Sequence, residues 1–117
     1  MARKASGGKY KKVKKKKLAG RQNQTRTVKL GERKTKIIRG RGGTKKLVAF
    51  QEKSVNLNIG KKTKKVEIKN VVETPSNIFL ARQNVLVKGA IIETELGKAK
   101  ITNRPSQEGN VQAIILK

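Results

Sequence analysis

Short runs in which apolar and polar residues alternate recur along the chain from residue 28 to its end. The clearest run is residues 54–59, where Val55, Leu57 and Ile59 alternate with serine and asparagine. Val66 and Ile68 repeat this spacing, and the phase then slips at residues 71–72, as it does at a β-bulge. A period of two places successive side chains on opposite faces of a β-strand. The pattern therefore predicts a body built from short strands.

Turn signals separate these strands from one another. Glycines at residues 40–43 predict a hairpin loop, and residues 60–62 and 96–97 predict two further turns. Residues 74–77 break a strand, and we expect Ser76 to cap one short helical turn that ends near Arg82. Residues 103–110 are expected to form a longer loop, and the last strand, apolar on both faces near its end, is expected well inside the sheet. The further predicted strands are residues 28–30, 34–39, 45–50, 85–87, 90–95, 98–102 and 111–116.

Several short strands with closely spaced turns are typical of a small closed or nearly closed barrel. We therefore predict an all-β fold, with a small β-barrel-like body of short, mostly antiparallel strands in residues 28–117. Residues 1–27 show no such period and are predicted to form an extended basic arm. The predicted core is aliphatic apart from one phenylalanine: Ile37, Val48, Phe50, Val55, Leu57, Val66, Ile68, Val87, Ile91, Ala99, Ile101, Val111, Ala113 and Ile115.

The positive charge of the chain is concentrated at its start. Residues 1–46 carry nineteen Lys and Arg against one acid, Glu32, so they hold +18 of the formal net charge of +24. A segment of this kind repels itself and buries too little apolar surface to become compact alone. It requires a polyanion, and a strongly basic chain of this kind favours a nucleic acid as the partner.

The composition also disfavours catalysis. The chain has no Cys, His or Asp, so the usual nucleophiles, general bases and metal ligands are missing, and we expect no enzyme activity, no cofactor and no metal. Alternation would place Glu93 and Glu95 on one strand face, and we interpret them as charge-balancing surface residues. No apolar run is long enough for a membrane span, so we expect no membrane partner. Because the usual catalytic residue types are missing, we also expect no small-molecule substrate.

Three features of the basic region suggest direct contact with a nucleic acid. The glycines in residues 6–8 and 40–43 allow the backbone to approach a phosphate. The planar guanidinium group of Arg41 can donate two parallel hydrogen bonds to a phosphate or to the edge of a guanine. The second loop could equally be an ordinary glycine hairpin, but its basic neighbours favour RNA contact. Tyr10 could stack on a base or pack on neighbouring lysine stems, and both readings stay open. Ile37 and Ile38 are flanked by basic residues, which is typical of a strand with one basic face.

Two separated blocks of the chain resemble a known family. The first comprises Arg3, Ser6-Gly7-Gly8, the basic run, Gly20-Arg21, Leu30-Gly31, Arg39, Arg41-Gly42-Gly43 and Lys45; the second comprises residues 86–93 and 97–102 with Arg104-Pro105. Together they resemble the ribosomal protein S8e family of the small subunit in archaea and eukaryotes, in its compact archaeal form. The resemblance implies a β-barrel body with an extended arm, a structural role in translation without enzyme activity, and a cytoplasmic location on the ribosome. The implied partners are small-subunit ribosomal RNA and neighbouring small-subunit ribosomal proteins.

The resemblance also implies a set of RNA-binding residues, which the charge pattern extends. From the resemblance come Arg3, Ser6, Gly7, Gly8, Lys9, Arg21, Arg39, Arg41, Gly42, Gly43 and Lys45. From charge and position come Lys4, Tyr10, Lys11, Lys12, Lys14, Lys15, Lys16, Lys17, Arg26, Arg33 and Lys46.

Other functions remain open from composition alone. A nucleic-acid-compacting or chromatin protein outside the ribosome would show the same charge. A membrane-surface or acidic-partner binder would need an amphipathic basic helix, and residues 1–30 lack the apolar spacing for one.

Overall fold

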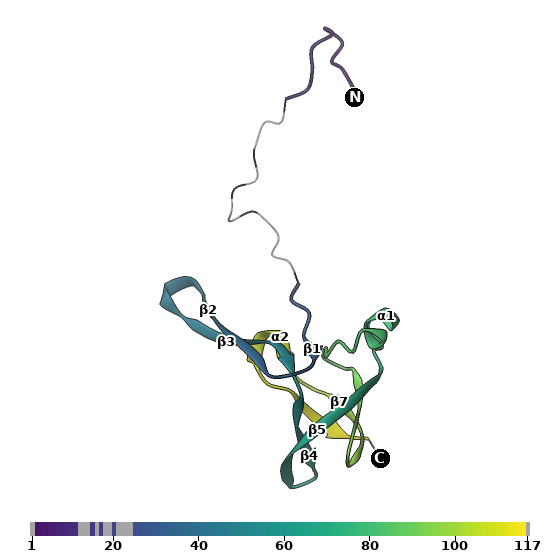
Figure 1. The fold of residues 1–117 in the computed structure, drawn as a ribbon. Helices are drawn as coiled ribbons and strands as arrows, with labels where there is room; N and C mark the ends of the chain where they lie inside the picture. Colours follow the sequence, from purple (N-terminus) through teal and green to yellow (C-terminus); the bar gives the residue numbers. More distant parts are fainter. Residues whose placement is uncertain (1, 12–14, 16, 18–19, 21–24, 117) are drawn as a thin grey trace.

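A closed five-stranded barrel forms the body of the protein (Figure 1). The computed structural model describes residues 2–11, 15, 17, 20 and 25–116. The barrel consists of β4 (Ser54–Ile59), β5 (Lys62–Glu73), β6 (Ile91–Thr94), β7 (Gly97–Ile101) and β8 (Gln112–Ile115). Successive strands pair antiparallel, and β8 closes the barrel by pairing parallel with β4. The predicted all-β barrel, with mostly antiparallel strands and an internal last strand, is confirmed.

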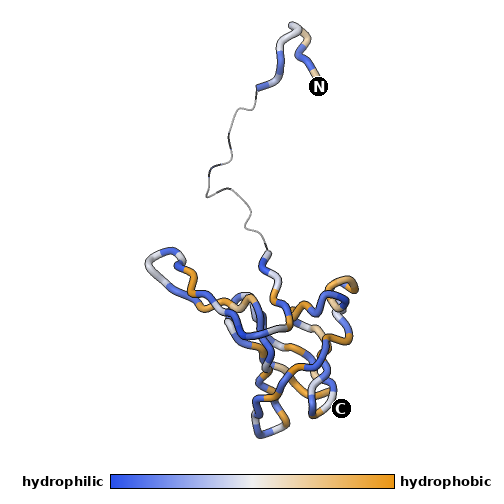
Figure 2. The backbone as a smooth tube through the Cα atoms, in the orientation of Figure 1, coloured by the Kyte–Doolittle hydropathy of each residue, from blue (hydrophilic) through white to orange (hydrophobic). Residues whose placement is uncertain are grey.

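A second, three-stranded sheet lies beside the barrel. It comprises β1 (Lys29–Leu30), β3 (Lys45–Glu52) and β2 (Lys34–Arg39), in the order β1-β3-β2. Only Lys53 separates β3 from β4, so the same stretch of chain serves both sheets. The β2–β3 hairpin projects away from the barrel, and Figure 2 shows that much of it is hydrophilic.

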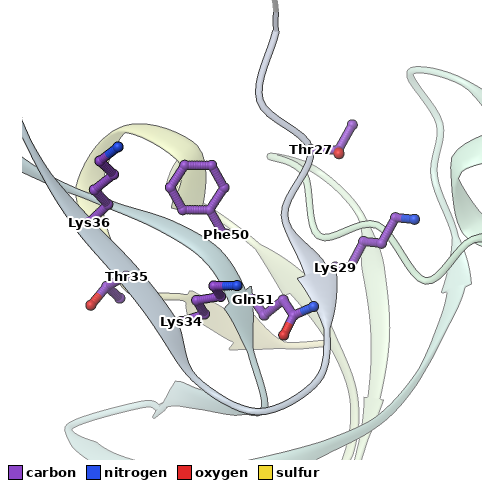
Figure 3. A pocket seen from close by; sticks show the side chains of 7 residues that line it. All are labelled: Thr27, Lys29, Lys34, Thr35, Lys36, Phe50 and Gln51. Carbon is purple, nitrogen blue, oxygen red and sulfur yellow. The ribbon is translucent and has the colours of Figure 1, made fainter.

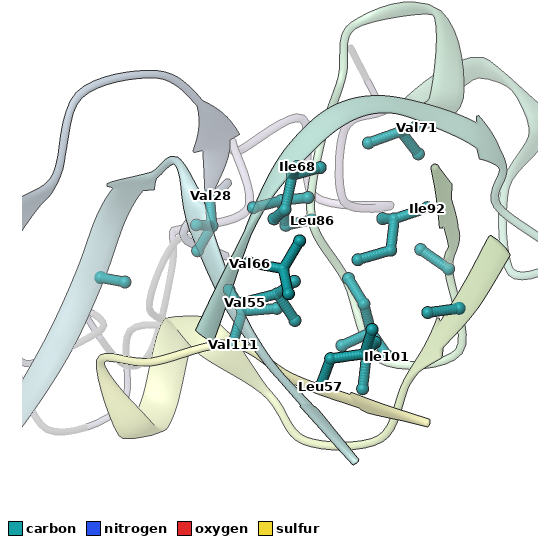
Figure 4. Packing of buried hydrophobic residues seen from close by; sticks show 14 residues of the cluster. Val28, Val55, Leu57, Val66, Ile68, Val71, Leu86, Ile92, Ile101 and Val111 are labelled. Carbon is teal, nitrogen blue, oxygen red and sulfur yellow. The ribbon is translucent and has the colours of Figure 1, made fainter. Parts of the chain in front are cut away.

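The barrel interior is filled by the side chains that alternation directs inward (Figure 4). Val55 and Leu57 of β4 are at most 1% exposed, as are Ile92 of β6 and Ile101 of β7. Adjacent strands therefore contribute to one continuous apolar cluster, whose buried members are Val28, Ala49, Val55, Leu57, Val66, Ile68, Val71, Leu86, Ala90, Ile92, Ala99, Ile101, Val111 and Ala113.

Three residues predicted for the core lie elsewhere. Ile37 is 64% exposed, because it belongs to the projecting hairpin and has no barrel beneath it. Ile91 is only partly buried, and its neighbour Ile92 fills the interior instead, which shifts the phase of β6 by one residue. Phe50 is half-buried and lies outside the buried cluster, at an irregularity of β3.

The predicted slip in β5 is present. The register against β6 shifts between Ile68 and Asn70 and again between Val71 and Glu73. These bulges bend a twelve-residue strand around the barrel.

The connection after β5 differs from the prediction. A short helix, α1 (Ile78–Arg82), forms as expected, but its cap is Asn77, whose side chain accepts from the Phe79 backbone N–H at 3.0 Å. The predicted cap, Ser76, therefore lies one residue before the cap that the structure shows. Residues 85–87 form no strand and make only an isolated bridge between Val85 and Lys29. Val85 and Leu86 are nevertheless buried, and the Leu86 N–H donates to the Val28 carbonyl at 2.7 Å.

The predicted loop 103–110 contains a second short helix, α2 (Pro105–Glu108). The Asn103 amide organises it by donating to Glu108 Oε2 at 3.0 Å and to the Asn110 carbonyl at 2.9 Å. Its Oδ1 accepts from the backbone N–H of Gln112 at 3.0 Å, at the start of β8. Pro105 at the first turn and Gly109 at the left-handed end are the usual residues at these positions.

Candidate nucleic-acid interface

The tip of the β2–β3 hairpin is a tight glycine turn that presents Arg41. The Gly40 N–H donates to the Thr44 carbonyl at 2.6 Å, and the Thr44 hydroxyl donates to the Arg41 carbonyl at 2.8 Å. Gly42 and Gly43 have φ of 68° and 73°, in the left-handed region that residues with a Cβ rarely adopt. The turn is thus internally hydrogen-bonded, and its arginine side chain is left exposed.

Basic residues face one another across this hairpin. Arg39 pairs directly with Lys45, and Lys46 occupies the next position opposite Ile38. Like charges directly opposite on neighbouring strands are destabilising. No acidic residue occurs between Arg33 and Gln51, so the hairpin itself supplies no counter-charge. The strands therefore hold one directly facing pair of positive charges, Arg39 and Lys45, which an external anion would neutralise.

Some of the predicted basic residues have partners within the protein. Arg33 Nε lies 3.6 Å from Glu52 Oε2, and the Glu52 side chain is almost fully buried. Arg26 Nε donates to the Ser106 carbonyl at 3.4 Å, and Lys46 Nζ donates to Gln107 Oε1. Arg26 thus ties the segment just before the body to α2, and Lys46 ties the hairpin to it, while Arg39, Arg41 and Lys45 are exposed.

The first described residues form a small turn of their own. Arg3 and Lys9 form a β-bridge, the Lys4 N–H donates to the Gly8 carbonyl at 2.9 Å, and Gly7 has φ of 78°. The sequence pattern had shown no strand pairing here, because a two-residue bridge leaves no period to detect. Lys4 Nζ stands 5.7 Å from the centre of the Tyr10 ring, which is itself 67% exposed. The ring thus contacts a neighbouring lysine and still presents surface to solvent.

The remaining residues of the predicted site divide by whether the structure describes them. Lys11, Lys15 and Lys17 are exposed, as are Ser6 and Gly8. Lys12, Lys14, Lys16 and Arg21 lie outside the described residues.

The sequence analysis did not predict two further basic surfaces that the structure shows. The β4–β5 turn carries Lys61, Lys62, Lys64 and Lys65, all exposed, at the end of the barrel away from the hairpin (Figure 1). A groove of about 500 Å³ lies beside β2 and is lined by Lys29, Lys34 and Lys36 together with Phe50 (Figure 3). The first was visible as a lysine-rich turn, whereas the second depends on strand pairings between distant residues.

The part of the chain that the structure describes contains no group of three or more His, Cys, Asp or Glu residues that could hold a metal ion. In the same part of the chain, no helix is long and apolar enough to cross a membrane. Glu93 lies directly opposite Lys98 on the neighbouring strand, but β6 ends at Thr94 and Glu95 lies in the turn that follows, so the two acids do not share a strand face as predicted.

A small barrel with a projecting hairpin rich in exposed Lys and Arg has the clustered basic surface that is typical of proteins that bind nucleic acid. The family model described as ribosomal protein S8e matches residues 1–116, and the chain belongs to this family of ribosomal proteins.

Individual relatives agree with this assignment. The chain is 47% identical to the small ribosomal subunit protein eS8 of Methanococcus aeolicus, over 97% of this chain and 91% of that protein. It is 43% identical to the protein of the same name from Pyrobaculum aerophilum, covering 97% and 90% of the two chains. It is 40% identical to the protein of the same name from Halorubrum lacusprofundi, over 97% of this chain and 93% of that protein.

Proposed function

We propose that this protein is a structural constituent of the small ribosomal subunit and binds ribosomal RNA through its β2–β3 hairpin and its basic arm. The observation that carries the proposal is the like-charged pair of Arg39 and Lys45 at the base of a tip that presents Arg41. The names of the relatives direct it to the small subunit. The role is architectural, on ribosomes in the cytoplasm, without a catalytic reaction or small-molecule substrate.

Two parts of the protein bind the RNA in different ways. The body, residues 28–117, docks by shape and places Arg39, Arg41 and Lys45 against phosphates. The arm, residues 1–27, lies between RNA helices, where converging phosphates would otherwise repel one another. Neutralising a phosphate releases condensed counterions, so each contact lowers the slope of log affinity against log salt by roughly 0.7 to 0.9.

The turn at Arg3–Lys9 supports the role of the arm. Gly7 adopts positive φ, and Gly8 has only the Ser6 hydroxyl within 4 Å of where a Cβ would stand. Backbone with this freedom can approach a phosphate closely, and Lys4, Lys9 and Lys11 surround it with exposed charge.

Crosslinking of the intact protein in cell lysate tests the proposal, with sequencing of the attached nucleic acid and mapping of the crosslinked peptides. We expect a focused set of small-subunit ribosomal RNA sites, attached to peptides from residues 6–17 and 39–46. Crosslinks scattered over DNA or mixed RNA would contradict the ribosomal role and favour a general nucleic-acid-compacting protein.

A pair of matched triple variants tests the hairpin. Changing Arg39, Arg41 and Lys45 to Gln removes three charges from it, and changing Lys53, Lys98 and Lys100 to Gln removes three from the barrel. Lys53 pairs with Glu67 at 3.2 Å and Lys98 lies opposite Glu93, so their charge is already partly balanced. We expect the hairpin variant to lose much more affinity for small-subunit RNA; equal losses would contradict the assignment of the interface.

A further inference from the structure

A groove between β1 and β2 combines an aromatic ring with three lysines. It has a volume of about 500 Å³, and its lining includes Lys29, Lys34, Lys36, Phe50 and Gln51. In Figure 3 the Phe50 ring lies between the strand that carries Lys34 and Lys36 and the segment that carries Lys29. Small-molecule sites in proteins commonly have about 300–1,000 Å³, so the groove is large enough for a single nucleotide.

A β-bulge positions the Phe50 ring. Thr35 pairs with Ala49 and Lys34 pairs with Gln51, so Phe50 is an extra residue of β3 that faces no residue of β2. A bulge of this kind turns a side chain away from the direction that regular alternation would give it. The bulge therefore explains why Phe50 is half-buried at the groove instead of inside the core.

Strand pairing also determines where the lysines lie. Gln51 is paired with Lys29 of β1 on one side and with Lys34 of β2 on the other, so these three residues form one row across the sheet. Paired residues on adjacent strands project from the same face. The row brings together two lysines that are five positions apart in sequence and separated by a strand in space.

The two acids closest to the groove in sequence, Glu32 and Glu52, line a different groove, together with Arg33. Glu52 follows Gln51 and projects from the opposite face, where it is buried against Arg33 and accepts hydrogen bonds from Ser54. None of the groove's seven lining residues, all within the described part of the chain, is acidic. The groove is therefore positive along its edges and apolar at its centre.

We propose that this groove binds one unpaired RNA nucleotide, with the base stacked on Phe50 and the flanking phosphates bound by Lys29, Lys34 and Lys36. Gln51 offers an amide donor and acceptor to the polar edge of the base. This inference rests on the proposed RNA-binding function and adds to it a site for a single-stranded element. An acidic peptide would satisfy the lysines, but the side chains of Asp and Glu have no aromatic face to stack on the ring, so a nucleotide fits both the lysines and the Phe50 ring.

The chain's composition makes the test selective. Tyr10, Phe50 and Phe79 are its only aromatic residues, so only these three rings could stack on a base. Phe79 lies on α1 and is 61% exposed, which makes it a matched control outside the groove. Replacing Tyr10 with Leu in every sample removes the ring of the arm and leaves Phe50 and Phe79 to be compared.

The probe is a single-stranded RNA tetranucleotide that contains 2-aminopurine, whose fluorescence is quenched when it stacks. In the full-length Tyr10→Leu protein we expect the probe to be quenched. Adding Phe79→Ala should leave this quenching unchanged, whereas adding Phe50→Ala should abolish it. The Phe50→Ala variant should also bind the probe about tenfold more weakly, since stacking on one ring commonly changes affinity by this order. Phe50→Leu, which keeps apolar bulk, should also lose quenching, and Phe50→Trp should restore it. Circular dichroism of Phe50→Leu establishes that the barrel is folded.

Other outcomes separate this site from the broader function. Equal quenching by the Phe50→Leu and Phe79→Ala variants would overturn the groove proposal, while intact binding of small-subunit RNA would leave the proposed function standing. Displacement of the tetranucleotide by an octaglutamate peptide whose own binding also depends on Phe50 would overturn the choice of a nucleotide. Lys36→Gln should weaken tetranucleotide binding more than Lys100→Gln on β7; the reverse order would place the probe elsewhere.

Discussion

Gly109 lies directly beneath the side chain of Leu47, so closely that a Cβ on the glycine would stand 2.8 Å from Leu47 Cγ. Gly109 ends α2 with φ of 75°, and Leu47 lies in the part of β3 that projects from the barrel. The contact places the α2 loop against the hairpin, where Lys46 also reaches Gln107. The absence of a side chain at one residue thus lets the barrel support its basic hairpin.

Gly109→Ala should lower the free energy of unfolding by about 1–3 kcal/mol from the left-handed backbone alone, with an additional cost from the collision with Leu47. Gly60→Ala is the control, because Gly60 also has positive φ but has nothing within 4 Å of the Cβ position. Thermal or urea denaturation should show a larger loss for Gly109→Ala. In the double variant with Leu47→Ala, the collision should be relieved; strictly additive effects would show that the two residues do not interact.

Lys45→Glu should stabilise the free protein while weakening its binding to RNA. The change replaces the like-charged Arg39–Lys45 pair by an opposite-charged one, which is worth roughly 0.2–1 kcal/mol. Lys98→Glu is the mirror control, since it creates a like-charged pair with Glu93 and should destabilise the protein. Denaturation and filter binding of small-subunit RNA measure the two effects. Loss of stability in Lys45→Glu would mean that the facing charges do not oppose folding.

Glu52→Ala should destabilise the protein by about 1–3 kcal/mol, because it removes a buried acceptor and leaves partly buried donors unsatisfied. Its side chain accepts from the Lys53 and Ser54 backbone N–H groups and from the Ser54 hydroxyl, besides pairing with Arg33. These contacts hold the junction where β3 leaves the hairpin sheet and becomes β4. Glu67→Ala, which breaks an exposed pair with Lys53, should cost less than about 1 kcal/mol. Urea denaturation compares the two, and a similar cost for both would contradict the role of the junction.

Deleting residues 1–17 should weaken RNA binding and reduce its dependence on salt. The segment contains nine basic residues, so the slope of log affinity against log salt should become shallower by up to roughly 6–8 if all of them contact phosphates. Titrations of small-subunit RNA at several salt concentrations give the slope. An unchanged slope would show that the segment makes few phosphate contacts. The hairpin triple variant provides the comparison, with a change of roughly 2–3 expected.

Local pattern was sufficient to predict the buried face of most barrel strands, although in β6 it gave Ile91 where the structure buries Ile92. The alternation at residues 54–59 predicted both β4 and its buried residues, and the phase slip predicted the bend of β5. Pattern failed at Ile37, because alternation shows that a strand has two faces but not whether anything covers either of them. It also failed at residues 85–87, where apolar residues are buried between other elements without joining a sheet.

The same division holds for the candidate site. Charge and glycine spacing, which are local properties, were enough to predict the turn at the hairpin tip around Arg41, whereas the basic arm stays a prediction. The sequence by itself thus determined an all-β body, its main strands and the surplus of positive charge. Only the tertiary structure decided that β1 pairs in parallel with β3, that a bulge turns Phe50 out of the core, and that Gly109 supports Leu47. The β1–β3 pairing and the Gly109–Leu47 contact join segments distant in sequence, and the bulge depends on how β3 pairs with β2, so the pattern of a single segment encodes none of them.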